Sequence, residues 1–251
     1  MLGLPGGIRA CLFDLDGVLT KTATVHASAW KQMFDAFLAS PAATAAGAEG
    51  GDLRPFDEHD DYDEYVDGKP RLDGVRDFLA SRHIHLPEGA ADDPATADTV
   101  NGLGNRKNEL VLRLIRERGV ETFPGSVEFV RAARQAGLRT AVVSSSANTR
   151  QVLEVTGIAD LFEERVDGVV ADREHLKGKP APDTFLAAAR RLGVPPAEAA
   201  VFEDALAGVA AGRAGGFGFV VGVDRVGQAQ ALAAHGADRV VSDLSELVEG
   251  A

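Results

Sequence analysis

The sequence predicts an α/β protein: a parallel β-sheet covered by helices on both faces, with a mostly helical segment inserted after the first strand. Three observations support this. The apolar run 8–13 ends at an acidic, glycine-containing turn, as a buried strand does. From residue 125 onward, short apolar runs alternate with helical periodicity. Between these parts, residues 21–120 contain helical patterns and polar loops but no comparable apolar run.

The composition is that of an ordinary globular protein able to bury a core. Hydrophobic residues make up 45% and charged residues 25% of the 251 residues. With 38 acids against 26 bases the net charge is −12, which argues against nucleic acid or an anionic membrane as a partner. A local basic pocket for a small anionic ligand remains compatible with this charge.

The cysteine count and the apolar runs exclude further classes. Cys11 is the only cysteine, so an intramolecular disulfide or a cysteine zinc cluster is excluded, and we expect a buried thiol. No apolar run approaches the ~20 residues that span a bilayer, and the first residues do not form a leader pattern. We therefore expect a cytoplasmic protein, with a monomer as the default.

The core domain is predicted to comprise residues 1–20 and 121–251. After the first strand, 8–13, the expected strands are 140–143, 166–170, 199–202, 219–223 and 239–241. The expected helices are 127–136, 148–156, 183–192, 205–214 and 228–235, most of them followed by glycine.

The insert, residues 21–120, is predicted to be helical with two long loops. Helices are expected at 24–38, from about 71 through 78, and at 105–119. Residues 41–51 and 83–99 are expected to be loops, and 68–71 a turn. The acidic run 52–67 is expected to be a solvated surface.

Polar residues follow the predicted strands where a parallel sheet binds ligands. These residues are Asp14 and Asp16, Ser144 to Ser146, Glu203 and Asp204, and Lys179 in the loop before the helix at 183. If the strands are neighbours, the groups converge. Clustered carboxylates repel one another, and a hard cation such as Mg²⁺ removes that cost. Lysine and hydroxyl groups suit a phosphoryl group, and an aspartate can form an aspartyl phosphate.

The motifs that hold these residues resemble those of the haloacid dehalogenase-like phosphotransferases. FDLDGVL at 13–19, Ser144, GKPAPD at 178–183 and FEDA at 202–205 follow the family's order. The resemblance implies a Rossmann-like core, with Asp14 as nucleophile and Asp16 as general acid and base. It also implies Mg²⁺ binding by Asp14, Asp16, Glu203 and Asp204, and phosphate binding by Ser144, Ser145 and Lys179.

Further segments resemble the β-phosphoglucomutase family. These are TKTATVHASAWK at 20–31, GKPRLDGV at 68–75, NRKNELVLRLI at 105–115 and SSSAN at 144–148. This resemblance implies a helical cap domain at 21–120 and interconversion of β-glucose 1-phosphate and glucose 6-phosphate through glucose 1,6-bisphosphate. The substrate-binding residues that it implies are Thr22, His26, Arg71, Lys107, Ser146 and Asn148, with Arg71 on the distal phosphate.

The sequence departs from this family's pattern in several places. Ala147 stands where a lysine is frequent, and Arg150 is the candidate to replace its charge. Lys21 stands where an aspartate is common, and the insert is longer through 40–67 and 83–100. The departures bear on the identity of the sugar more than on the reaction class.

Two alternatives stay open at this point. A sugar-phosphate phosphatase uses the same core motifs, with water in place of a sugar hydroxyl as the acceptor. A non-enzymatic phospho-aspartate switch also combines aspartate, Mg²⁺ and lysine on a parallel sheet, although the long insert and the paired aspartates argue against it.

Overall fold

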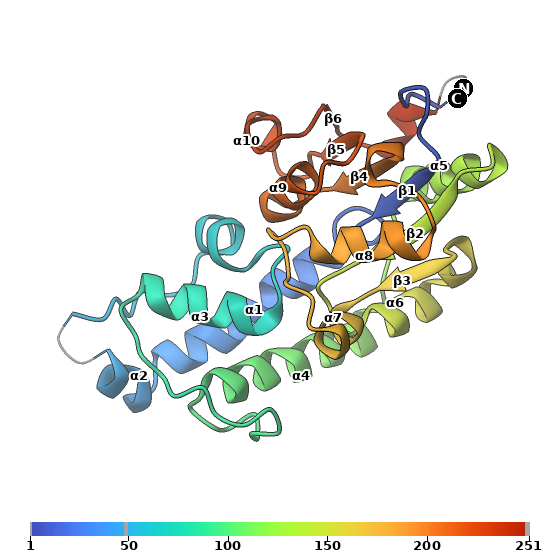
Figure 1. Ribbon diagram of the computed structural model, residues 1–251. Coiled ribbons are helices and arrows are strands. Elements are labelled where there is room, and N and C mark those ends of the chain that lie inside the picture. Colours follow the sequence, from blue (N-terminus) through green and yellow to red (C-terminus); the bar gives the residue numbers. More distant parts are fainter. Residues whose placement is uncertain (1, 48–49, 249–251) are drawn as a thin grey trace. The chain divides into compact units, whose positions relative to one another are not determined.

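The computed structural model describes residues 2–47 and 50–248 (Figure 1), so part of the predicted loop 41–51 lies outside the described residues. The chain divides into two compact units, which we call the core unit and the helical unit. The core unit comprises residues up to Thr22 and from Val120 onward, and the helical unit comprises Ala23–Gly119.

The core unit is built on a parallel sheet of six strands in the order β3-β2-β1-β4-β5-β6. The strands are β1 (Ala10–Phe13), β2 (Arg139–Val143), β3 (Glu164–Val166), β4 (Ala199–Glu203), β5 (Phe219–Val223) and β6 (Arg239–Val241). β1 is central, and its last residue, Phe13, is in register with Val142 on one side and Phe202 on the other. The strand order changes direction beside β1, so the residues after β1, β2 and β4 flank the ligand-binding crevice of such a sheet.

Helices cover both faces of this sheet, as predicted. They are α5 (Pro124–Gln135), α6 (Thr149–Thr156), α7 (Gly168–Glu174), α8 (Asp183–Arg191), α9 (Leu206–Ala214) and α10 (Ala229–Ala234). Successive strand residues point to opposite faces: Leu12 packs with the α8 and α9 side chains, whereas Phe13 stacks on Phe202 at 4.6 Å and meets Phe129 of α5 at 6.1 Å. Burial of both faces explains the continuous apolar strands.

The predicted strand 166–170 is wrong in its extent. The strand β3 ends at Val166, and α7 begins two residues later. The cause is Asp167, a buried N-cap whose Oδ1 accepts the Val170 N–H at 2.9 Å. An N-capping aspartate starts a helix even where valines follow, because it satisfies a backbone donor that would otherwise be buried.

The helical unit contains α1 (Ala23–Leu38), α2 (Pro41–Ala46), a π-helical turn (Tyr62–Val66), α3 (Arg71–Ser81) and α4 (Val100–Arg118). An aromatic cluster forms its core. Phe34 lies 5.2 Å from Trp30 and 4.0 Å from Phe78 between ring centroids, and Phe56 lies 5.2 Å from Phe78. Aromatic pairs at these distances add to the free energy gained by burying their area.

Two predictions for this unit need correction. Part of the predicted loop 41–51 is the helix α2, which Pro41 starts and Ser40 caps by accepting the Ala43 N–H at 3.3 Å. The helix predicted at 105–119 begins at Val100, because Thr99 caps it through the Gly102 N–H at 2.9 Å. Both caps are short-range signals that outweigh the Ala- and Gly-rich composition around them.

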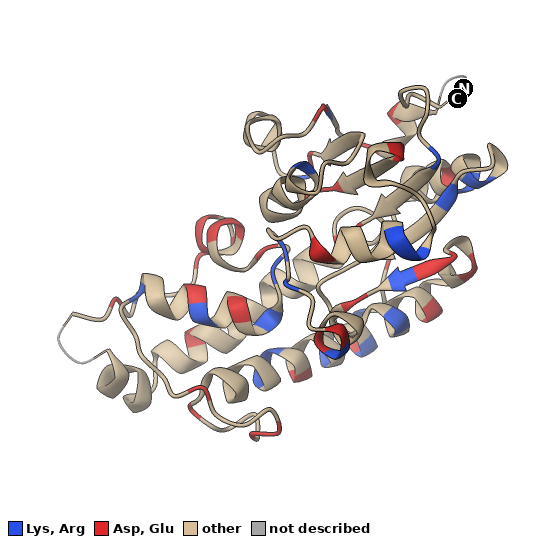
Figure 2. Cartoon of the chain, in the orientation of Figure 1, with Lys and Arg blue, Asp and Glu red and all other residues tan. Residues whose placement is uncertain are grey.

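The acidic run 52–67 is more than a solvated surface (Figure 2, red segment ahead of α3). Asp61 is nearly buried and pairs with Nη2 of the buried Arg82 at 2.5 Å. Arg82 also lies 2.9 Å from Asp52 and 5.0 Å over the Phe78 ring. Part of the acidic run therefore anchors this segment to α3 by satisfying a buried guanidinium. Across the described ranges, no helix combines the length and the apolarity needed to cross a membrane.

Candidate active site

Lys179 joins the groups that follow three neighbouring strands of the core unit. Its Nζ lies 2.5 Å from Oδ1 of Asp14, directly after β1, and donates to Oε1 of Glu203 at the end of β4. It also lies 3.3 Å from the carbonyl of Val143, the last residue of β2. All three side chains are buried. The convergence of the strand ends around Asp14 therefore exists in the structure.

Burial and charge act in opposite directions on this group. Burial raises the pKa of Asp14 and of Glu203, and the Lys179 ammonium opposes that rise in both. The negative charge of Asp16 adds to the rise at Asp14, and that of Asp14 adds to the rise at Glu203. For Lys179, burial alone would lower the pKa, but the two carboxylates raise it above its usual range. The lysine therefore stays charged between two carboxylates that would otherwise take up protons.

Asp16 is oriented by a threonine pair. The Thr22 hydroxyl donates to Oδ1 of Asp16, and the Thr20 and Thr22 hydroxyls lie 2.7 Å apart. Thr20 also contacts the Leu15 carbonyl at 3.1 Å. The turn between Asp16 and Thr20 is tight, since the Gly17 N–H donates to the Thr20 carbonyl at 2.7 Å. Thr22, predicted from resemblance, thus contacts Asp16 directly.

Gly17 allows Asp204 to approach this turn. A Cβ at Gly17 would stand 1.7 Å from Oδ2 of Asp204, and φ at Gly17 is +84°, a conformation that favours glycine. The Asp204 carboxylate therefore packs directly against the residue that follows Asp16. The Asp204 carbonyl accepts a hydrogen bond from Nε2 of Gln228 at 3.1 Å.

The donor set around Asp14 suits a hard divalent cation. The carboxylates of Asp14 and Glu203 contact Lys179, while Asp16 and Asp204 lie at the turn that contains Gly17. Carboxylate and carbonyl oxygens are the ligands that Mg²⁺ prefers. Over residues 2–47 and 50–248, no three His, Cys, Asp or Glu side chains are arranged around one metal position. A metal site made of two carboxylates and one backbone carbonyl needs no third side chain, so it is compatible with this finding.

Glu203 has partners other than a metal. Its Oε1 accepts from Lys179 and its Oε2 accepts the Ala205 N–H at 3.0 Å. A Cβ at Gly208 would lie 1.8 Å from Oε1, so the side chain is enclosed by α9. The predicted contact of Glu203 with the metal would have to compete with these bonds, whereas its contact with Lys179 is direct.

The predicted phosphate-binding loop follows β2. The N–H of Ser144 donates to the Val166 carbonyl at 3.0 Å, and its Oγ accepts the Ser146 N–H at 3.1 Å. Ser146 Oγ in turn accepts the N–H of Asn148, the N-cap residue of α6, at 3.2 Å. A Cβ at Gly168 would stand 2.8 Å from the Ser145 carbonyl, so the start of α7 packs against the loop. The hydroxyl groups of Ser144 and Ser146 therefore fix the backbone of this loop.

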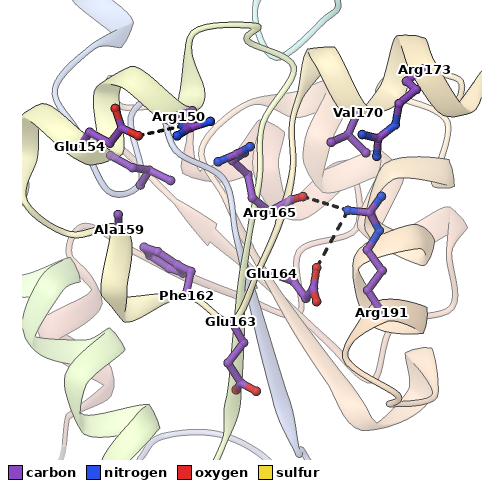
Figure 3. A pocket seen from close by; sticks show the side chains of 11 residues that line it. Arg150, Glu154, Ala159, Phe162, Glu163, Glu164, Arg165, Val170, Arg173 and Arg191 are labelled. Carbon is purple, nitrogen blue, oxygen red and sulfur yellow. Dashed lines mark hydrogen bonds and ion pairs between the residues drawn. The ribbon is translucent and has the colours of Figure 1, made fainter.

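The departures from the family's pattern have local partners. Arg150 does not replace the missing lysine charge: it pairs with Glu154 at 2.8 Å and lines a hollow of about 400 Å³ beside β3, to which Ser144–Asn148 do not contribute (Figure 3). The other arginines of the hollow are also matched by carboxylates, Arg165 by Asp167, and Arg173 and Arg191 by Glu174. The hollow therefore lacks the excess positive charge of a phosphate site. Lys21 pairs with Glu121 at 2.7 Å.

The three predicted site residues of the helical unit gather along α4. Nζ of Lys107 lies 2.9 Å from Nδ1 of His26 and 4.7 Å from the centroid of the Trp30 ring. One turn earlier on α4, a Cβ at Gly104 would lie 3.5 Å from Nε of Arg71, which begins α3. Burial lowers the pKa of His26, and the Lys107 ammonium lowers it further, so His26 is neutral and accepts from the lysine.

Sequence reasoning missed several contributors to the site. Thr20 has a weak local signal, because it stands only two residues before Thr22, whose hydroxyl its own contacts. The Val143 carbonyl carries no sequence signal. Arg225, whose Nε lies 2.8 Å from the Gly17 carbonyl, is far from Gly17 in the chain and belongs to no motif.

Comparison with known proteins shows to which family the chain belongs. The family model described as haloacid dehalogenase-like hydrolase matches residues 8–216. The β-phosphoglucomutase of Mycobacterium tuberculosis is 58% identical over 251 residues, which cover 99% of this chain and 94% of that protein. The chain belongs to the β-phosphoglucomutase family of haloacid dehalogenase-like proteins. The enzyme of the same name from Bacillus subtilis is 34% identical, over 96% of this chain and 92% of its own length.

Solved structures agree with this assignment to the β-phosphoglucomutase family. A β-phosphoglucomutase from Clostridium difficile superimposes with a TM-score of 0.73 at 26% identity, over 96% of this chain and 93% of that one. The predicted Rossmann-like α/β fold is confirmed, and the membership supports phosphotransferase chemistry.

Proposed function

We propose that this chain is a β-phosphoglucomutase that interconverts β-D-glucose 1-phosphate and glucose 6-phosphate through glucose 1,6-bisphosphate. The observation that carries the proposal is the contact of Lys179 with Asp14 at the carboxyl ends of β1, β2 and β4, in a chain 58% identical to a β-phosphoglucomutase. A buried carboxylate held by a lysine at this edge is suited to accept a phosphoryl group.

Asp14 is the proposed nucleophile. One of its carboxylate oxygens attacks the phosphorus of the bisphosphate, the phosphorus–oxygen bond to the sugar breaks, and phospho-Asp14 forms. Lys179 and the Ser144 loop hold the phosphoryl oxygens, whose negative charge spreads during transfer. Lys179 is already ordered by Asp14 and Glu203, so little reorganisation is needed when the phosphate arrives.

Asp16 is the proposed general acid and base. As a carboxylic acid it protonates the sugar oxygen that leaves phosphorus, and as a carboxylate it later takes the proton from the attacking sugar hydroxyl. The hydrogen bond from Thr22 holds Oδ1 and so fixes the orientation of the Asp16 carboxyl group. The same residue therefore serves both half-reactions.

Asp14, Asp204 and the Asp16 carbonyl are the proposed ligands of Mg²⁺, with Glu203 beside them. The cation would neutralise part of the charge of these carboxylates and of the transferring phosphate. Ser145 contributes its backbone to the phosphate site in this proposal.

The helical unit is the proposed cap, with boundaries that we predict at residues 21–120. A bisphosphate has a second phosphate, and Arg71 is the proposed residue that binds it with its guanidinium fork, together with Ser146 and Asn148 of the core unit. Lys107 is the proposed contact for sugar oxygens, with His26 as its partner. The monomeric state and the cytoplasmic location stay predictions.

A coupled assay tests the proposal. The protein is incubated with β-glucose 1-phosphate, Mg²⁺ and a trace of glucose 1,6-bisphosphate, while glucose 6-phosphate and free phosphate are measured in parallel. We expect rapid formation of glucose 6-phosphate with little free phosphate. Free phosphate alone would favour the phosphatase, and a long-lived phospho-Asp14 without sugar turnover would favour the switch.

A further inference from the structure

A loop after β5 is held rigid beside the predicted catalytic turn of the core unit. Asp224 follows the strand, and its Oδ1 accepts the N–H groups of Val226 at 3.2 Å, Gly227 at 2.7 Å and Gln228 at 2.8 Å. Its own N–H donates to the Val241 carbonyl at 2.8 Å. An aspartate that satisfies three successive donors fixes the backbone of the loop. The side chains of this loop therefore project from a defined position.

Arg225 of this loop contacts the turn that carries Asp16. Its Nε lies 2.8 Å from the Gly17 carbonyl, and its Nη2 lies 3.4 Å from the Val18 carbonyl. Its Nη1 lies 2.8 Å from the Ser242 carbonyl, and the guanidinium carbon lies 3.6 Å from the centroid of the Phe123 ring. One planar side chain thus joins the segment after β1, the segment before α5 and the end of β6.

The partial burial of the Arg225 guanidinium costs free energy, so a contribution to stability alone does not explain its position. Its side chain is 17% exposed, and burial lowers its pKa, with the carboxylates of Asp243 and Asp204 opposing that change. The ion pair with Asp243 is 3.5 Å long, and most of its hydrogen bonds go to backbone carbonyls. A partly buried guanidinium whose acceptors are mainly backbone carbonyls is well suited to fixing the path of that backbone.

The same loop also holds the second carboxylate-bearing turn. Nε2 of Gln228 donates to the Asp204 carbonyl at 3.1 Å, while Arg225 holds the Gly17 carbonyl. Gly17 and Asp204 are packed so closely that a Cβ on Gly17 would overlap Oδ2 of Asp204. A shift of the Gly17 peptide therefore changes the position of both Asp16 and Asp204.

We propose that Arg225 is a positioning residue of the active site: by holding the Gly17 and Val18 carbonyls it sets the placement of Asp16 and, through Gly17, of Asp204. The inference rests on the proposed catalytic roles of Asp16 and Asp204, but not on which phosphorylated sugar is used. Gln228 supports the same arrangement by holding the Asp204 carbonyl.

The test compares Arg225→Met with Arg191→Met. Arg191 is a matched control, since its side chain is 23% exposed and it joins the Arg165 carbonyl to Glu174 in the same unit, beside the hollow of Figure 3. Arg225→Lys keeps the charge but loses the fork. If Arg225→Met does not fold, Arg225→Lys is the variant that tests the proposal.

Two readouts separate positioning from stability. The first is kcat and KM with β-glucose 1-phosphate or, if the wild-type chain does not turn that sugar over, with p-nitrophenyl phosphate. The second is hydrogen exchange of residues 14–22, where the N–H groups of Gly17, Leu19 and Thr20 donate within the turn at 2.7–2.9 Å. We expect Arg225→Met to lower kcat about 10²-fold with a smaller effect on KM. We also expect faster exchange of this segment and partial rescue of Arg225→Ala by added ethylguanidinium.

The outcomes are distinct. Arg191→Met is expected to lower the melting temperature while kcat and exchange at 14–22 stay as in the wild type. Wild-type kcat in Arg225→Met and Arg225→Lys, or unchanged exchange at 14–22, would overturn the positioning role. A wild-type chain that forms no glucose 6-phosphate would instead count against the proposed function. In that case the exchange comparison still decides the role of Arg225.

Discussion

The hydroxyl of Thr22 donates a hydrogen bond to Oδ1 of Asp16. The contact lies within the core unit, and Thr20 supports it at 2.7 Å from the Thr22 hydroxyl. An aspartate that exchanges a proton with a substrate must present one oxygen in a fixed direction. Thr22 supplies that direction by holding the other oxygen.

Thr22→Val should therefore lower kcat about 10²-fold with little change in fold, because valine keeps the shape and loses the donor. Thr22→Ser should restore most of the activity. Thr140→Val is the matched control, since Thr140 is also buried and donates to the Leu161 carbonyl at 2.7 Å near the start of β2. Steady-state kinetics of the three variants check this. A Thr22→Val enzyme with wild-type kcat would contradict the orienting role.

Asp14→Asn should reduce turnover by about 10³-fold or more, because an amide oxygen is a poor nucleophile toward phosphorus. The variant should still fold, since asparagine retains the size and one acceptor for Lys179. Mass spectrometry after incubation with glucose 1,6-bisphosphate should find no phosphorylated residue 14. Asp172→Asn, at an exposed position of α7, should behave as the wild type. Phosphate incorporation elsewhere in Asp14→Asn would point to another nucleophile.

Lys179→Met should destabilise the core unit as well as inactivate it. The substitution leaves two buried carboxylates without their shared cation, and breaking a buried ion pair on one side costs about 3–5 kcal/mol. In Lys179→Met/Glu203→Gln one of those charges is also removed, so the double variant should lose less free energy of unfolding than the sum of the single losses. Urea denaturation measures all three variants. Additive losses would mean that Lys179 and Glu203 are not coupled.

The His26–Lys107 contact predicts a pH dependence of stability. His26 has a lowered pKa in the folded chain, so below about pH 6.5 the unfolded chain binds a proton that the folded chain does not. This contribution leaves stability unchanged above that pH and lowers the free energy of unfolding as the pH falls toward the folded pKa.

Urea denaturation across pH 5–8 and NMR titration of the His26 ring would measure this effect. Lys107→Met should raise the pKa of His26, because it removes the neighbouring positive charge. His26→Gln should reduce the loss of stability in acid, while His235→Gln, at the residue after α10 of the core unit, should leave the His26 titration unchanged. An unchanged His26 pKa in Lys107→Met would contradict the coupling.

Much of the core site could be predicted because it depends on strand ends. Asp14 and Glu203 each stand at the carboxyl end of an apolar run, and neighbouring parallel strands bring such ends together. The path of Lys179 from a loop to both carboxylates could be expected only from the order of the motifs. The errors in the elements arose where one side chain outweighs the pattern, as Asp167 does by capping α7 and Ser40 by capping α2.

The contacts of Arg225 could not be predicted in the same way. They join carbonyl groups of Gly17 and Val18 to a side chain more than two hundred residues away, and a backbone carbonyl leaves no trace in the sequence. The burial of Asp61 is a similar case, because its partner Arg82 stands 21 residues later, at the end of α3, and the acidic run alone suggests solvent. Long-range partners decide such positions, whereas local patterns decide helices and strands.

Arg71→Ala should separate the mutase from simple phosphate-ester hydrolysis. Arg71 begins α3, and a guanidinium at this position can hold a phosphate through two parallel hydrogen bonds. If it binds the distal phosphate of the bisphosphate, its loss should lower kcat/KM for β-glucose 1-phosphate by about 10²-fold, as expected for a charged hydrogen-bonded contact of 1.5–3 kcal/mol. Hydrolysis of p-nitrophenyl phosphate, which lacks a second phosphate, should change little.

The control is Arg76→Ala, since Arg76 lies on the same helix and pairs with Asp73 and Glu88 at the surface. It should leave both activities near the wild-type values. Equal losses of both activities in Arg71→Ala would assign Arg71 to the stability of α3 and remove it from the distal phosphate site. A loss confined to the sugar phosphate would support the mutase over the phosphatase, because only the mutase must hold a substrate with two phosphates in two orientations.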